Sequence, residues 1–163
     1  MITLRKVDSR NIWDLTKLSV ADSQRNFVAT NTESILEAYC AITAGGVAMP
    51  YGIYDDDLPV GFLMIGYGCD DWEDAPPIAR KNYSLWRFMI DERYQGKGFG
   101  KAAMASALAL IRSFPCGKAE CCFLSYEPGN TAAKALYHSF GFREAYPRTY
   151  SPRLPRSHPS RTA

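Results

Sequence analysis

Apolar and polar residues alternate in several short segments of the chain, as they do in strands that bury one face. This alternation predicts strands at residues 2–7, 47–54 and 60–67. The connection 55–59 reads Asp-Asp-Asp-Leu-Pro, which is rich in turn formers and predicts a hairpin between the second and third strands. A nearly continuous aromatic and aliphatic run at 83–91 predicts a buried central strand.

Apolar residues at helical spacing separate these strands along the chain. Helices are expected at 9–18 (cap Ser9), 98–112 and 131–139, and residues 24–42 show an interrupted helical pattern in which Thr32 is the expected cap. Two shorter strands are expected at 118–125 and 142–146. Strands and helices therefore alternate through the second half of the chain, which indicates an α/β protein of the α+β type.

The composition fits one compact domain. The chain has 163 residues, of which 47% are hydrophobic, and this is enough for a single core. The segment 69–81 is first acidic and then proline-bearing, so we expect a surface loop there. After residue 146 the sequence is dominated by Pro, Arg and Ser. We therefore expect a domain at 1–146 and a loosely ordered tail at 147–163.

Charge and cysteine content narrow the class of partner. The formal net charge is +2 without a long run of Lys or Arg, which argues against a nucleic acid or a membrane surface and favours a small molecule. Five cysteines without disulfide or zinc spacing favour reduced thiols and no metal site. The N-terminus lacks the apolar core of a signal peptide, and no window approaches the roughly 20 apolar residues of a membrane span. These features predict a cytoplasmic protein.

Three glycines, at positions 96, 98 and 100, lie where the central strand turns into a helix. Glycine lets successive backbone N–H groups face outward at the positive end of a helix, which suits a pyrophosphate. No Lys-Ser/Thr pair follows the last glycine, so an ATP-binding loop is not indicated. Glu120 has the spacing of the acidic residue of a dinucleotide-binding unit, but the loop follows the fourth strand rather than the first.

The segment 95–100, Gln-Gly-Lys-Gly-Phe-Gly, resembles the Gln/Arg-x-x-Gly-x-Gly/Ala motif of the GCN5-related N-acetyltransferases (GNAT). The preceding residues 87–95 are similar to bacterial spermine/spermidine acetyltransferases of that family, and 130–142 resembles its last helix, which ends in Leu-Tyr and Gly-Phe. The resemblance implies a mixed, mostly antiparallel sheet of six or seven strands, about four flanking helices and a splayed central pair of parallel strands.

The resemblance also implies acetyl-CoA as co-substrate. The fourth strand would pair with the pantetheine arm, the glycine loop would hold the pyrophosphate through its amides, and Asn130 would contact the arm. The implied cofactor-binding residues are Phe88, Met89, Ile90, Gln95, Gly96, Lys97, Gly98, Phe99, Gly100, Lys101 and Asn130. For the side chains of the two lysines, a contact with phosphate and simple solvation are equally good interpretations.

Acetyl transfer to an amine requires an acid for the departing thiolate and a neutral amine. Tyr137 matches the family's acid, although an aromatic residue at helical spacing is also typical of a core position. Where many relatives carry an acid on the fourth strand, the residues 84–86 are Ser, Leu and Trp. Asp91, Glu92 and Glu127 are candidates for the general base, but capping and turn roles are the commoner interpretation of these residues. Removal of the amine proton through a relay of water molecules is at least as good an explanation.

A polyamine is the acceptor that the resemblance favours. Glu33 and Glu37 are spaced i, i+4 and would face one groove, but a solvated helix face is the commoner interpretation of such a pair. The acidic segment 70–74 is a second possible groove, and Trp86 fits a more apolar amine. Another small amine, a protein N-terminus or lysine, and a non-catalytic acyl-CoA-binding module remain alternatives. A homodimer is also compatible with the family.

Overall fold

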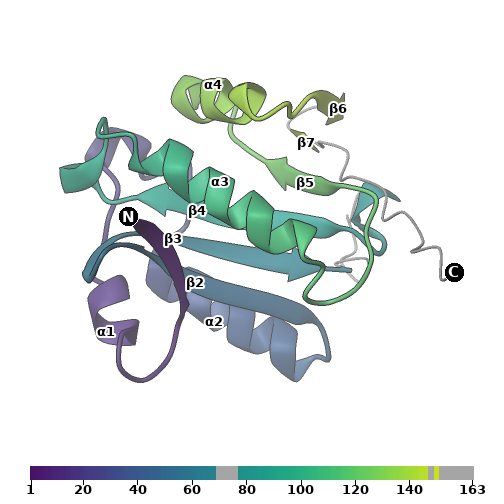
Figure 1. Cartoon of the computed structure of the whole chain (residues 1–163), viewed down its shortest axis with the longest axis horizontal. Helices are drawn as coiled ribbons and strands as arrows, with labels where there is room; N and C mark the ends of the chain where they lie inside the picture. Colours follow the sequence, from purple (N-terminus) through teal and green to yellow (C-terminus); the bar gives the residue numbers. More distant parts are fainter. Residues whose placement is uncertain (69–76, 147–148, 151–163) are drawn as a thin grey trace, which may run out of the picture.

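Five strands form one continuous open sheet in sequence order: β1 (Ile2–Lys6), β2 (Val47–Asp55), β3 (Leu58–Tyr67), β4 (Tyr83–Ile90) and β5 (Cys122–Ser125). The structure is a computed structural model of the chain, and it describes residues 1–68, 77–146 and 149–150. The pairs β1–β2, β2–β3 and β3–β4 are antiparallel, and β4–β5 is parallel. This mixed sheet confirms the predicted fold class (Figure 1).

A short hairpin extends the sheet at β5. It consists of β6 (Glu144–Tyr146) and β7 (Thr149–Tyr150), and β7 lies between β5 and β6. The predicted count of six or seven strands therefore overstates the continuous sheet, and only this hairpin brings the strand order to seven. The hairpin also crosses the predicted domain boundary at residue 146, because β7 pairs with β5. The rest of the predicted tail and the acidic segment 70–74 lie outside the described residues.

Helices cover both faces of the sheet. The described residues form α1 (Ile12–Leu15), α2 (Asn31–Thr43), α3 (Phe99–Arg112) and α4 (Thr131–Ser139), with single 3-10 turns η1 (Asp22–Gln24), η2 (Pro77–Ala79) and η3 (Glu92–Tyr94). Figure 1 shows α3 in front of the sheet and α2 behind it. On β3, Leu63 and Ile65 join the core cluster beneath α3, whereas Phe62 and Met64 join the cluster of α1 and α2. Successive side chains of β3 thus point to opposite faces of the sheet, as the predicted alternation requires, and they contribute to a separate core cluster on each face.

Two helix starts differ from the prediction. Helix α2 begins after Thr30 rather than Thr32, because Thr30 and Glu33 form a capping box: Thr30 Oγ1 accepts the Glu33 N–H at 3.2 Å, and the Glu33 carboxylate accepts the Thr30 N–H at 2.8 Å. Helix α1 begins after Asn11 rather than Ser9, because the Asp8 carboxylate accepts the Arg10 N–H at 2.8 Å and holds these residues in a turn.

The parallel strands β4 and β5 separate soon after they begin. Their ladder contains only the pairs Tyr83↔Cys122 and Ser84↔Phe123. Beyond Ser84, β4 pairs with β3 on one side and has no ladder partner in β5 on the other. A register shift in the β3–β4 ladder leaves Trp86 unmatched, so this residue is the extra one of a β-bulge. The splay that the family resemblance implied is therefore present.

Side chains hold the closed end of the splay together. The Tyr83 hydroxyl accepts the N–H groups of Cys116 at 2.9 Å and Gly117 at 3.2 Å and donates to the Gly117 carbonyl at 3.0 Å. The Asn82 amide oxygen accepts the N–H groups of Glu120 and Cys121. These bonds replace sheet pairing in this segment, so β5 begins at Cys122 and not at residue 118 as predicted.

Candidate active site

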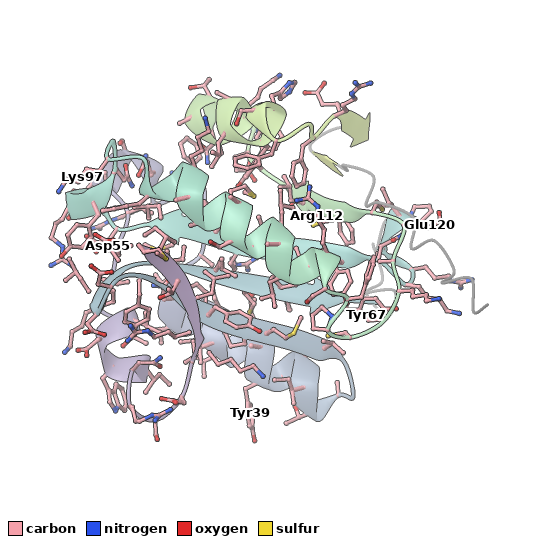
Figure 2. The ribbon with its side chains drawn as sticks, viewed as in Figure 1. Tyr39, Asp55, Tyr67, Lys97, Arg112 and Glu120 are labelled. Atoms are coloured by element: carbon pink, nitrogen blue, oxygen red, sulfur yellow. The ribbon has the colours of Figure 1, made fainter. Side chains whose placement is uncertain are left out.

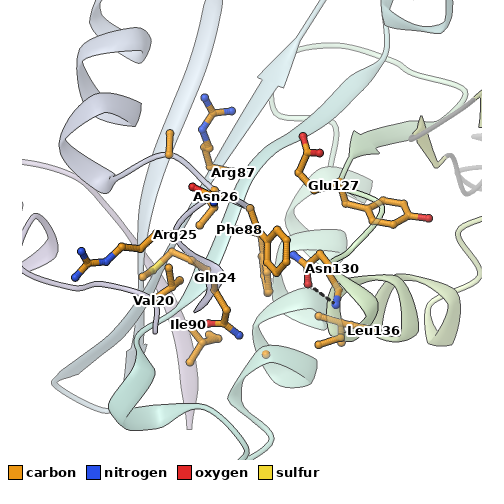
Figure 3. Close-up of a pocket in the computed structure, with 18 of the residues that line it drawn as sticks. Val20, Gln24, Arg25, Asn26, Arg87, Phe88, Ile90, Glu127, Asn130 and Leu136 are labelled. Atoms are coloured by element: carbon orange, nitrogen blue, oxygen red, sulfur yellow. Dashed lines mark hydrogen bonds between the residues drawn. The ribbon is translucent and has the colours of Figure 1, made fainter. Parts of the chain in front are cut away.

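A cavity of about 1050 Å³ opens between the diverging strands β4 and β5 and continues to the start of α2 (Figure 3). Its walls come from β4, the glycine loop, the start of α4, the turn after β5 and the segment before α2. The lining side chains are mostly apolar or uncharged, and the charged ones are Arg25, Glu33, Arg87 and Glu127. This is the mixed lining expected of a small-molecule site.

The glycine loop ends one side of the cavity. Gly96 and Gly98 have positive φ angles of 74° and 83°, and Gly98 is the N-cap of α3. A Cβ atom built on either glycine meets nothing within 4 Å, so glycine is needed here for backbone conformation rather than for space. The first helical bond runs from the Ala102 N–H to the Gly98 carbonyl, which leaves the preceding amides of the first turn for an anion.

The predicted loop residues divide between lining and support. Gln95, Gly96 and Gly100 line the cavity, whereas Lys97, Gly98, Phe99 and Lys101 do not. Phe99 packs against the core beneath α3. Lys97 is exposed, with its ammonium group 5.3 Å from the centre of the Tyr94 ring, and Figure 2 shows it at the outer edge of the molecule. The backbone of this loop is therefore better placed toward the cavity than its lysine side chains.

The unpaired edge of β4 supplies a second wall. Phe88, Met89 and Ile90 all line the cavity, and each also pairs with β3 on the opposite edge. A strand edge without a neighbour presents backbone N–H and C=O groups that an extended, amide-bearing molecule can pair with. The splay thus provides the arrangement that a pantetheine arm requires.

Tyr137 and Asn130 face this edge from α4. Tyr137 is buried and packs against Tyr126 and Phe142, with ring centres 6.1 Å and 5.9 Å away. Burial raises the pKa of the Tyr137 hydroxyl to about 12. The Asn130 side-chain oxygen accepts the Ala133 N–H at 3.1 Å, which caps α4, while the residue also lines the cavity. In Figure 3, Asn130 and Phe88 lie on facing walls.

The far end of the cavity carries the predicted substrate residues. Glu33 and Trp86 line it, whereas Glu37 does not and instead pairs with Arg87, whose Nη2 lies 2.6 Å from the Glu37 carboxylate. Glu33 serves the capping box described above. Thr30 donates two hydrogen bonds to the Glu33 carboxylate and lowers its pKa below the ordinary value, and Arg87 adds a smaller effect in the same direction.

Three parts of this site were not identified from the sequence. They are Arg87, the segment from Gln24 to Thr30 that forms a wall before α2, and the ion pair of Asp91 behind the loop. The wall segment offered no motif, and it reaches the cavity only through tertiary contacts, such as the 2.8 Å bond from Gln95 Nε2 to Gln24 Oε1. Of the three, only Asp91 carried a signal in the sequence, which predicted a capping role. That role is confirmed, because the Asp91 carboxylate accepts the Arg93 N–H at 3.1 Å at the start of η3, but its bond to Ser19 was not predicted.

Asp91 connects the end of β4 to the segment after α1. Its buried carboxylate accepts the Ser19 N–H at 3.0 Å and an Arg93 side-chain N–H at 2.7 Å. Burial alone would raise the pKa of Asp91, but the hydrogen bonds from Arg93 and Ser19 outweigh it and hold the pKa below the ordinary value. A carboxylate whose pKa is lower in the folded state stabilises the fold above its unfolded pKa of about 3.9, and this stabilisation is lost as the pH falls through the folded pKa.

We expect Asp91→Asn to lower the free energy of unfolding at pH 7 by about 2 kcal/mol, because charge-assisted hydrogen bonds of a buried carboxylate are lost. Below about pH 4 the difference from wild type should shrink, since the carboxylate of the unfolded chain takes up a proton there and the folded one follows at its lower pKa. Urea unfolding at pH 7 and pH 3.5 measures both values. Asp14→Asn is the matched control, because Asp14 forms only an exposed pair with Lys17. An equal effect of both substitutions would contradict the role of Asp91.

These walls suit an acyl donor with a pyrophosphate and a long, amide-bearing arm, and they define the class of acyl-coenzyme A-dependent transferases. The described residues hold no group of three or more His, Cys, Asp or Glu side chains placed to bind a metal ion. None of the helices in the described ranges is long and apolar enough to cross a membrane.

Comparison with known proteins identifies the family. The model of the acetyltransferase (GNAT) family matches residues 12–142, and the chain belongs to this family. It is 38% identical to the spermine/spermidine N(1)-acetyltransferase of Bacillus subtilis (strain 168) over 145 residues, which cover 87% of this chain and 88% of that protein. It is 36% identical to the probable spermine N(1)-acetyltransferase of Bacillus subtilis subsp. natto, with the same coverage. The protein is therefore an acetyl-CoA-dependent N-acetyltransferase, as the sequence resemblance implied.

A solved structure supports the fold assignment. An aminoglycoside acetyltransferase in complex with coenzyme A superposes with a TM-score of 0.72 at 16% identity, covering 94% of this chain and 95% of that chain. At this identity the likeness establishes the fold, and the sequence relatives carry the family assignment.

Proposed function

We propose that the protein transfers the acetyl group of acetyl-CoA to a primary amine of a polyamine by direct attack. The observation that carries the proposal is the single cavity that joins the glycine loop and open β4 edge to the Glu33 carboxylate. Such a cavity brings an acyl donor and a cationic acceptor together without a covalent enzyme intermediate. The two Bacillus subtilis relatives, named as spermine or spermidine acetyltransferases, favour a polyamine among the possible amines.

For the donor, we infer that the loop amides from Gln95 to Lys101 hold the pyrophosphate at the start of α3. The backbone of Phe88, Met89 and Ile90 would pair with the pantetheine arm, and the Asn130 side chain would contact it. The positive φ angles at Gly96 and Gly98 support this assignment, because they leave the loop backbone uncovered. A backbone N–H of β4 next to Met89 would polarise the thioester oxygen. The N–H groups of Phe88 and Ile90 are the candidates, because the register that bonds the Asp91 N–H to the Val60 carbonyl turns the Met89 N–H toward β3.

The reaction forms a C–N bond and breaks the C–S bond of the thioester, so the departing thiolate needs a proton. We assign this proton to the Tyr137 hydroxyl, since its pKa of about 12 keeps it protonated throughout the physiological range. The attacking nitrogen loses a proton in the same reaction. Leu85 and Trp86 line the cavity where a carboxylate base would be expected, and we infer that water carries this proton to solvent.

The proposal is tested by incubating the protein with acetyl-CoA and a panel of amines while following free thiol. Spermidine, spermine and 1,4-diaminobutane should stimulate thiol release more than an aromatic monoamine, an aminoglycoside or a lysine peptide. A different amine at the top of the panel would replace the polyamine assignment within the same enzyme class. If acetyl-CoA binds and no amine stimulates release, the chain is an acyl-CoA-binding module.

Another small, more apolar amine is the second candidate. It is favoured by Trp86, which the bulge places in the cavity wall, and by the ion pair that occupies Glu37.

We also infer a cytoplasmic location, for which the free thiols of Cys40, Cys116, Cys121 and Cys122 are the supporting observation. The homodimer stays a prediction.

A further inference from the structure

The two carboxylates predicted to receive ammonium groups are both under the influence of one guanidinium. Arg87 extends from β4, next to the bulge, and binds Glu37 on α2 with an Nη2–Oε2 distance of 2.6 Å. Its positive charge also acts on Glu33, one helical turn earlier on α2. The Arg87 guanidinium therefore acts on both carboxylates of α2, of which only Glu33 lines the cavity together with Arg87.

The Arg87 guanidinium is fixed in the wall of the cavity. Its Nη1 donates to the Trp86 carbonyl at 3.1 Å, and its carbon lies 5.7 Å from the centre of the Trp86 ring. The Arg87 side chain is 19% exposed, compared with 43% for Glu37. In Figure 3, Arg87 points away from Phe88 and Asn130, so it belongs to the acceptor end rather than to the donor wall.

One part of the guanidinium is not satisfied. The Arg87 Nε–H is buried and has no hydrogen-bond partner, which costs free energy for a charged donor. A shorter, uncharged residue at this position would avoid this cost. The ion pair with Arg87 also neutralises the Glu37 carboxylate, which therefore attracts a cationic ligand less strongly. A positive charge thus lies beside both carboxylates, and it would repel the ammonium groups of an acceptor that approach them.

On the basis of the proposed polyamine activity, we propose that Arg87 is a specificity-determining residue that neutralises Glu37 and thereby disfavours highly charged acceptors. With Glu37 paired, Glu33 is the remaining carboxylate of the pair for an ammonium group distant from the reacting amine. The site then favours a diamine over a tetraamine, because each additional ammonium group would have to approach Arg87.

The test compares kcat/KM for spermine with kcat/KM for 1,4-diaminobutane. Arg87→Met removes the charge and keeps much of the volume, so the ratio of spermine to diamine should rise about fivefold, the effect of one partly exposed ion pair. The rise should be larger at low ionic strength. Arg87→Lys keeps the charge and should retain a ratio near that of wild type. Arg10→Met is the matched control, because it removes one positive charge from an exposed pair with Asp8 outside the cavity.

A double substitution separates charge from packing. Glu37→Gln should lower the spermine ratio, and Arg87→Met combined with Glu37→Gln should return it to the wild-type value, because the local net charge is restored. Thermal unfolding confirms that each variant is folded. An unchanged or lower ratio in Arg87→Met overturns the proposal. Loss of activity toward every acceptor with acetyl-CoA binding intact also overturns it, because Arg87 would then be required for the acceptor site as a whole and not for selection among acceptors.

The wild-type enzyme distinguishes this failure from failure of the proposed function. If wild type acetylates polyamines and the ratio does not respond to Arg87, only the specificity role is wrong. If wild type acetylates other amines and no polyamine, the proposed function is wrong and the role of Arg87 falls with it.

Discussion

Tyr137→Phe should lower kcat by at least about 100-fold while leaving the KM for acetyl-CoA nearly unchanged, since loss of a general acid typically costs two to four orders of magnitude. Phenylalanine keeps the ring that packs against Tyr126 and Phe142, so the fold should be preserved. Steady-state thiol release with a saturating amine measures kcat, and a titration of acetyl-CoA measures KM.

The pH dependence sharpens this prediction. Because burial raises the pKa of Tyr137 to about 12, the hydroxyl stays protonated up to about pH 10. The wild-type rate should therefore not fall between pH 8 and pH 10 as an unperturbed tyrosine with a pKa near 10 would require. A decline with an apparent pKa near 10 that disappears in Tyr137→Phe would show that the hydroxyl titrates normally.

A second phenol in the cavity provides the competing hypothesis. Tyr126 also lines the cavity, and its hydroxyl donates to the Glu144 carboxylate at 3.2 Å. If Tyr126→Phe rather than Tyr137→Phe abolishes thiol release, the acid has been assigned to the wrong residue. Tyr39→Phe is the control for removing a tyrosine hydroxyl outside the cavity, because Tyr39 is exposed on α2 and points away from the sheet in Figure 2.

The local features of this protein could be predicted from its sequence. The alternation along β2 and β3 and the helical spacing of α3 and α4 gave the order of the elements and the division of the core. The glycine loop was identifiable because three glycines where a strand meets a helix have a conformational explanation, and Gly98 does adopt a positive φ. Each of these signals is carried by residues close together in the chain.

The parts that sequence reasoning missed depend on residues far apart in the chain. Arg87 and Glu37 are separated by 50 positions and Asp91 and Ser19 by 72, and neither pair has a periodicity that connects its members. The bulge at Trp86 is defined by its register against β3, which no pattern within β4 reveals. Glu33 and Glu37 do lie one turn apart on α2, as their i, i+4 spacing predicted. The sequence did not predict that Arg87 pairs with Glu37 and offsets its negative charge.

The glycine loop gives the other large expected effect. Gly98→Val should raise the KM for acetyl-CoA at least about tenfold, with a smaller change in kcat. A left-handed backbone costs a non-glycine residue about 1–2 kcal/mol, and valine is among the residues least tolerated there. Relaxing this strain turns the first amides of α3 away from the pyrophosphate, and each lost charge-assisted bond weakens binding further. Gly98→Ala should have a weaker effect in the same direction.

Gly45→Val separates phosphate binding from backbone strain. Gly45 has a φ of 84°, almost equal to the 83° of Gly98, its Cβ would also meet nothing within 4 Å, and it lies after α2 outside the cavity lining. Both valine variants should therefore lose similar stability, and only Gly98→Val should lose affinity for acetyl-CoA. Acetyl-pantetheine, which lacks the pyrophosphate, should be used equally well by wild type and Gly98→Val. If both donors lose affinity alike in this variant, the loop supports the fold of the site rather than binding the phosphates.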